Sequence, residues 1–166
     1  MKLALFLLIC VTIAFGQGIF PSIKSVGLAT MVDGPETDFA PSDLLAAKIE
    51  QVLKIKVVDL DLSVEGFDKI YEGNISSSSI RQIAEKNKVQ AVMVGRIRYK
   101  FRPSIIVNGG IVCDLAFSYK IIDISGNIVA RGVLLEVGPG FSETVAFNVA
   151  IDRSVERLAN KLNMPI

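Results

Sequence analysis

The sequence predicts a single domain of the α/β class, more narrowly α+β, in which a mixed sheet of about five strands has helices packed on it. Two observations support this prediction. Helical and strand-like segments alternate up to residue 90, as parallel strands joined by helices require. Three strand-like segments then follow with no helix between them, which predicts an antiparallel three-strand meander.

The first elements follow from changes in the hydrophobic period. Residues 23–31 form an apolar run that ends at the turn-forming residues 32–35, which predicts a buried strand. From residue 42 onward apolar residues recur at helical spacing, so we expect a helix over residues 42–53. Residues 55–62 are rich in β-branched side chains, which indicates a second strand.

Two short helices are expected next. Ser63 is placed to cap a helix that Gly73 ends. Residues 76–79 are expected to form a loop, because Ser79 and Gln82 have the spacing of a capping box. The second short helix therefore begins after Ser79 and ends near residue 87.

The meander is expected over residues 91–102, 111–124 and 128–137. Pro103 stops its first strand, and the Gly- and Asn-rich residues 108–110 and 125–127 form its turns.

The residues Gly138-Pro139-Gly140 are expected to break the last strand. A closing helix is expected over residues 142–162. Its apolar residues recur at helical spacing and are expected to face the sheet: Phe147, Ile151, Val155, Leu158 and Leu162.

Residues 1–16 have the pattern of an export signal, with a positive start, an apolar run and a small-x-small end at residues 14–16. A membrane anchor is the alternative, but the run is shorter than the about 20 apolar residues of a spanning helix. Cys10 raises lipidation as a further alternative, although Ile9 stands where a lipoprotein signal has a small residue. We expect residues 17–166 to form one domain in the periplasm, associated with the outer membrane if Cys10 is lipidated.

Charge and residue content exclude several classes of function. The chain has 18 basic and 17 acidic residues, and without residues 1–16 it has 17 of each, so no net charge draws it to nucleic acid. The chain contains no histidine, and with Cys10 removed Cys113 has no cysteine to pair with. Cys113 lies in an apolar strand, where a cysteine is usually a small buried hydrophobe. We expect no cofactor and no catalytic residue.

Three stretches carry a family resemblance: residues 25–29 (SVGLA), residues 83–95 (IAEKNKVQAVMVG) and residues 121–129 (IIDISGNIV). With them the chain resembles the periplasmic α/β domain shared by the curli-secretion lipoprotein CsgG, the LpoB-type activators of penicillin-binding proteins and the amino-terminal domain of TolB. The resemblance implies a compact bacterial envelope domain that binds partners. CsgG-type pore formers add long membrane-spanning hairpins and a lipid anchor, and we expect that about 150 residues leave no room for both.

Two segments are candidate partner-binding sites. Alternation along residues 91–102 places four cations on one side of a strand: Arg96, Arg98, Lys100 and Arg102. This basic stripe suits an acidic protein, a phosphate-bearing glycan or lipid headgroups, or it is a solvent face partly neutralised by Asp114 or Glu136. The second segment is the apolar run Ile105, Ile106 and Val107. It is either an exposed loop tip that contacts a partner or a bilayer, or a continuation of the strand pair.

The function expected from these features is protein–protein interaction by an exported, non-enzymatic protein, in assembly or maintenance of the outer membrane or cell wall. The first alternative is an accessory protein of secretion or of a pore that forms homo-oligomers through its sheet edge or residues 103–110. The second is a hydrolase with a carboxylate mechanism.

Overall fold

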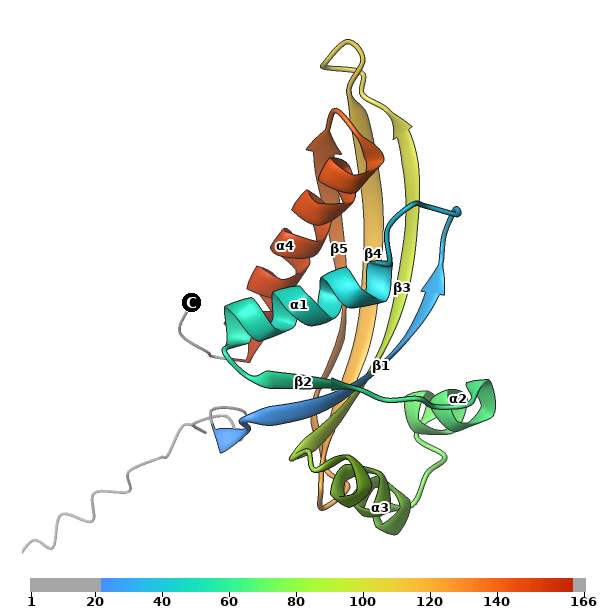
Figure 1. Cartoon of the computed structure of the whole chain (residues 1–166), viewed down its shortest axis with the longest axis vertical. Coiled ribbons are helices and arrows are strands. Elements are labelled where there is room, and N and C mark those ends of the chain that lie inside the picture. The colour runs from blue at the N-terminus through green and yellow to red at the C-terminus, as the bar shows by residue number, and fades with distance from the viewer. Residues whose placement is uncertain (1–21, 163–166) are drawn as a thin grey trace, which may run out of the picture.

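The structure, a computed structural model, describes residues 22–162 and contains one five-stranded mixed sheet with four helices packed on it (Figure 1). The order of the strands in the sheet is β2-β1-β3-β4-β5. Their bounds are β1 Ser25–Asp33, β2 Lys56–Asp59, β3 Ala91–Pro103, β4 Ile111–Asp123 and β5 Ile128–Gly140. β1 pairs in parallel with β2 and β3, whereas β3, β4 and β5 form the predicted antiparallel meander.

The helices lie on both faces of this sheet. Their bounds are α1 Pro41–Leu53, α2 Val64–Glu72, α3 Ser77–Asn87 and α4 Glu143–Lys161. Helices α1 and α4 cover one face, and α2 and α3 pack on the other near the end of the sheet where β2 lies (Figure 1). The expected fold class is therefore confirmed.

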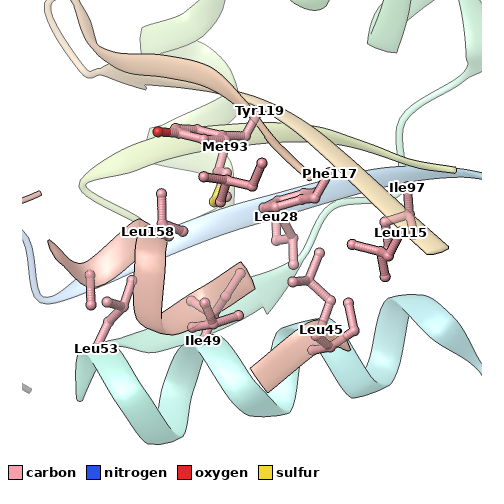
Figure 2. Close-up of a cluster of buried hydrophobic side chains, with 14 of the residues drawn as sticks. Leu28, Leu45, Ile49, Leu53, Met93, Ile97, Leu115, Phe117, Tyr119 and Leu158 are labelled. Atoms are coloured by element: carbon pink, nitrogen blue, oxygen red, sulfur yellow. The ribbon is translucent and has the colours of Figure 1, made fainter. Parts of the chain in front are cut away.

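The larger core lies between the sheet and the pair α1 and α4. Figure 2 shows Leu45 and Ile49 of α1 and Leu158 of α4 pointing toward Leu28 and Phe117 of the sheet. All five side chains are at most 3% exposed. Because α4 carries an apolar residue at every turn of one face, the sequence predicts both this helix and the face that it buries.

Helix α4 lies unusually close to the edge strand β5. A Cβ atom on Gly138 would be 2.0 Å from the carbonyl oxygen of Ala146, and one on Gly140 would be 2.6 Å from the backbone nitrogen of Ala146. These glycines therefore allow the backbones of the helix and the strand to approach. The predicted break of the strand at residues 138–140 is wrong, because β5 is an edge strand and tolerates Pro139.

The smaller core lies beneath α2 and α3. Phe67 and Ile70 of α2 and Ile80 of α3 pack on Val92 and Val94 of β3. Each of β3, β4 and β5 has 13 residues and is about 43 Å long. The 9 residues of α2 and the 11 of α3 give helices of only about 14 and 17 Å. The second face of the sheet is therefore covered over part of its length.

Some element boundaries differ from the sequence-based expectation. Helix α3 begins one turn early, because Ser76 rather than Ser79 is its cap: the Ser76 hydroxyl accepts the N–H of Ser79 at 3.2 Å. Strand β2 ends at Asp59, although the N–H of Leu60 still donates to the carbonyl of Leu28 and its side chain packs into the smaller core. Ser63 and Gly73 cap α2 as expected. The expected signal at residues 1–16, with Cys10, lies outside the described residues.

Across residues 22–162 the structure contains no helix with both the length and the apolar character needed to cross a membrane.

The close approach of α4 and β5 gives a first testable prediction. Gly138→Val should lower the free energy of unfolding by about 3 kcal/mol, because the new side chain meets backbone atoms that cannot move aside. Gly132→Val on the same strand is the matched control, since its Cβ would meet no atom closer than the Tyr119 hydroxyl oxygen, at 3.3 Å. Urea unfolding followed by circular dichroism measures both changes. Equal losses for the two variants would contradict the proposed contact.

Candidate binding surface on the open half of the sheet

The uncovered part of the second sheet face is the candidate binding surface. We call it the open face, and it consists of Arg98, Lys100 and Arg102 of β3, Asp114 and Ala116 of β4, and Val133, Leu135 and Val137 of β5. Strand register places Arg98, Ala116 and Leu135 in one row across β3, β4 and β5, and Lys100, Asp114 and Val137 in the next row. The surface therefore has a polar side on β3 and an apolar side on β5.

Arg96 belongs to the covered half of this face, unlike the other cations of the predicted stripe. Its guanidinium lies 5.0 Å from the centre of the Tyr71 ring and forms an ion pair with Asp68 at 3.2 Å, both residues being on α2. The side chain is 27% exposed. Arg96 thus attaches α2 to the sheet, and the four cations do not form one exposed stripe.

The other three cations of the stripe are exposed and have acidic neighbours. Arg98 lies 3.4 Å from Asp33, and Lys100 lies 4.0 Å from Asp114. Arg102 donates two hydrogen bonds to the Asp114 carboxylate, at 2.9 and 3.2 Å. These bonds lower the pKa of Asp114 below its ordinary value, so the carboxylate stays charged at neutral pH. Three cations and two carboxylates leave one net positive charge here.

Glu136 does not neutralise the stripe as the alternative interpretation expected. Its side chain lies on the opposite face of β5, where Arg157 of α4 contacts it at 2.7 Å. Alternation along the strand explains this difference, because Leu135 and Val137 occupy the open face. Of the two acidic residues expected beside the stripe, the structure confirms Asp114.

The apolar side of the open face is a row of three aliphatic side chains on β5. Val133 is 57% exposed, Leu135 67% and Val137 44%. A shallow groove of about 580 Å³ runs beside this row and is bordered by Arg98, Lys100 and Asp114 on its polar side. Aliphatic side chains that gather in one exposed patch indicate a binding surface more strongly than scattered ones.

The outer edge of β5 is already occupied by two arginines of α4. Arg153 donates a hydrogen bond to the carbonyl oxygen of Val137, and Arg157 donates one to the carbonyl oxygen of Leu135 at 3.4 Å. An added strand would need these carbonyls for its own ladder. Growth of the sheet past β5 is therefore disfavoured at the level of the open face.

The segment 104–110 is a loop, not a continuation of the strand pair. Pairing between β3 and β4 ends at Pro103 and Ile111. Ile105 is 93% exposed and Ile106 90%, so the apolar residues do form an exposed tip. The structure thus decides between the two interpretations of this segment, while its role in binding stays a prediction.

Cys113 is the small buried hydrophobe that the sequence predicts. Its side chain is 0% exposed, and burial raises the pKa of its thiol to about 12. The reactive thiolate is therefore scarce at neutral pH. Among residues 22–162, no three acidic or cysteine side chains are grouped closely enough to hold a metal ion.

Sequence reasoning missed the β5 row. A signal was present, since Val133, Leu135 and Val137 alternate with Gly132, Leu134, Glu136 and Gly138. Two glycines on the alternate positions indicate the side against which another backbone packs. The three aliphatic residues then have to lie on the opposite side, away from α4.

No protein-family model matches the chain, and no curated protein sequence matches it. Among solved structures, a lipoprotein from Neisseria meningitidis is 12% identical with a TM-score of 0.46, and the match covers 82% of this chain and 98% of that one. PelC from Paraburkholderia phytofirmans, solved as a dodecamer, is 17% identical with a TM-score of 0.48. The match covers 86% of this chain and 89% of the PelC chain. The LpoB C-terminal domain from Salmonella enterica is 15% identical with a TM-score of 0.39. The match covers 72% of this chain and 93% of the LpoB domain.

The different surroundings of Arg96 and Arg98 give a second prediction. Arg96→Ala should lower the free energy of unfolding by about 1–2 kcal/mol, because the sheet loses its stacking and ionic contacts with α2. Arg98→Ala, the matched control two residues along, should change it by less than about 0.5 kcal/mol, since its ion pair is exposed. Thermal and urea unfolding measure both changes. A larger loss for Arg98→Ala would overturn the assignment of Arg96 to the interior.

Proposed function

We propose that this protein is an exported, non-enzymatic binding module of the bacterial cell envelope that holds a protein partner against its open face. The single observation that carries the proposal is the exposed row Val133, Leu135 and Val137 beside a groove bordered by charges. The expected export signal at residues 1–16 supports the location. Assembly or maintenance of the outer membrane or cell wall is the process that we propose for it.

The chemistry of the open face defines the kind of partner. Burial of each half-exposed aliphatic side chain contributes about 1 kcal/mol, so an apolar partner segment gains most from the β5 side. Arg98 and Lys100 are 61% and 76% exposed and can accept acidic side chains along one flank of that segment. We therefore propose a partner segment with an apolar side and acidic residues next to it.

The edge of β5 limits how the partner binds. Because Arg153 and Arg157 occupy the carbonyls of Val137 and Leu135, a partner strand does not gain a hydrogen-bond ladder there. The partner is expected to pack face-on, across β3, β4 and β5. This arrangement disfavours homo-oligomers formed by joining sheet edges at β5.

Three observations support a non-enzymatic role. The chain contains no histidine, the commonest general base. The Cys113 thiol is buried, with its pKa raised to about 12. Asp114, the acidic residue at the centre of the open face, is engaged by Arg102 and so is poorly placed to transfer a proton.

Site-specific crosslinking in living cells tests the proposal. A photoreactive benzophenone amino acid in place of Leu135 should give one discrete adduct with a heterologous envelope protein. The same amino acid in place of Val64 is the matched control, because Val64 is 68% exposed but lies on α2. We expect no adduct, or a different one, at Val64.

Two outcomes would contradict the proposal. An adduct with twice the mass of the chain would show that the open face binds a second copy. The absence of any adduct at positions 133, 135 and 137, in cells where the protein folds and is exported, would show that the face binds no protein partner.

A further inference from the structure

A second apolar feature, adjacent to the open face, lies at the end of the β3–β4 hairpin. Ile105 and Ile106 are 93% and 90% exposed and are the two most exposed large hydrophobic residues among those described. With Val107, which is 42% exposed, they form what we call the apolar tip. Figure 1 shows this loop at the far end of the molecule, beyond the ends of β5 and α4. The tip can therefore reach a flat surface that the rest of the domain does not touch.

Part of the loop backbone is hydrogen-bonded within the loop itself. The Ser104 hydroxyl accepts the N–H groups of Ile106 and Val107, at 3.2 and 3.0 Å. The N–H of Ser104 is donated to the carbonyl of Gly110, and that of Gly110 to the carbonyl of Val107. Four donors in the loop are thus satisfied within it. This removes much of the cost of moving a turn into an apolar environment.

Two guanidinium groups lie behind the tip, together with two carboxylates. Arg102 lies three residues before Ile105 and borders the hollow that the apolar tip lines. A second cation, Arg153, borders the same hollow as Ile105, Ile106 and Val107. The acidic residues nearby are Asp114, which Arg102 binds, and Glu143 on the other side of the loop. Apolar residues in front and guanidinium groups behind correspond to the layers of acyl chains and headgroup phosphates in a bilayer.

We propose that the apolar tip inserts into the interface of an anionic lipid bilayer, with Arg102 and Arg153 meeting the headgroup phosphates. Three residues are far too few to cross the bilayer, so the contact is peripheral. A bilayer suits a protruding tip whose isoleucines stand free of their neighbours, whereas a protein partner would need a matching pocket. Insertion would also orient the domain, with the long strands steep to the membrane and the open face accessible from the side.

The absence of tryptophan from the sequence allows a reporter at a single position. Ile106→Trp in the full chain should show a blue-shifted emission when vesicles of phosphatidylethanolamine with about one quarter phosphatidylglycerol are added. Brominated acyl chains in those vesicles should quench this emission strongly. Val64→Trp is the matched control and should show neither effect. Both variants carry the same N-terminal residues, so membrane binding by that segment is common to both.

The role of Arg102 is tested by two substitutions that should change the affinity for the vesicles in opposite directions. Asp114→Asn leaves Arg102 without its neutralising partner and should raise the affinity for the anionic vesicles, and Arg102→Glu should lower it. At low salt, each substitution should change the affinity by a factor of up to about ten. Neither should change the affinity for purely zwitterionic vesicles. Ile105→Ser combined with Ile106→Ser should weaken binding by at least about tenfold.

The proposal fails if the tryptophan at position 106, or at position 105 when the first variant does not fold, stays water-exposed and unquenched with vesicles present. It also fails if that tryptophan becomes buried only after an envelope protein is added, since the tip would then contact a protein. Neither result bears on the crosslinking at Leu135, which tests the open face separately.

Discussion

The long strands β3, β4 and β5 cannot be covered along their whole length by the short helices α2 and α3. A 13-residue strand is about 43 Å long, whereas the 9 residues of α2 make a helix of about 14 Å. This mismatch leaves half of one sheet face without a layer over it. The groove, the β5 row and the projecting hairpin tip all depend on it.

The opposite face of the sheet is covered by helices α1 and α4. The 19 residues of α4 lie against β5, and Gly138 and Gly140 let the two backbones approach. α1 extends that layer over β1 and β2. Because this core is complete, the open face is not needed to hold the domain together. Its aliphatic residues are therefore free to serve binding.

Polar contacts mark where the covered half ends. Tyr71 of α2 donates a hydrogen bond to Ser118 of β4 at 2.8 Å, and Lys120 donates to the carbonyls of Ile70 and Tyr71 at the end of the helix. Arg96 stacks against the same tyrosine. One step further along the strand, Arg98 is exposed. Arg96 therefore stabilises the contact between α2 and the sheet, whereas Arg98, the next residue on the same face of β3, is exposed and can bind a partner.

Most of the fold follows from local pattern, but the candidate surface does not. Spacing along α4 and alternation along β3 and β4 predict those elements and their buried sides, because periodicity follows directly from helix and strand geometry. Arg96 and Arg98 are equivalent in the sequence, and only the position of α2 distinguishes them. Likewise, Ser76 and Ser79 are both good caps, and the burial of Ile80 is consistent with either. Which part of the sheet face is covered depends on where helices from distant parts of the chain pack. A local sequence pattern does not predict this.

Thiol labelling of a cysteine on the open face is the most direct test of the claim that this face is occupied in the cell. Leu135→Cys gives an accessible thiol, while the native Cys113 is buried and its pKa is raised to about 12, and the unsubstituted chain supplies the background. Val64→Cys on α2 is the reference position. In purified protein both cysteines should react with a maleimide at similar rates. In intact envelopes position 135 should react at least about tenfold more slowly while position 64 is unchanged. Equal rates at the two positions in the envelope would show that the open face has no partner.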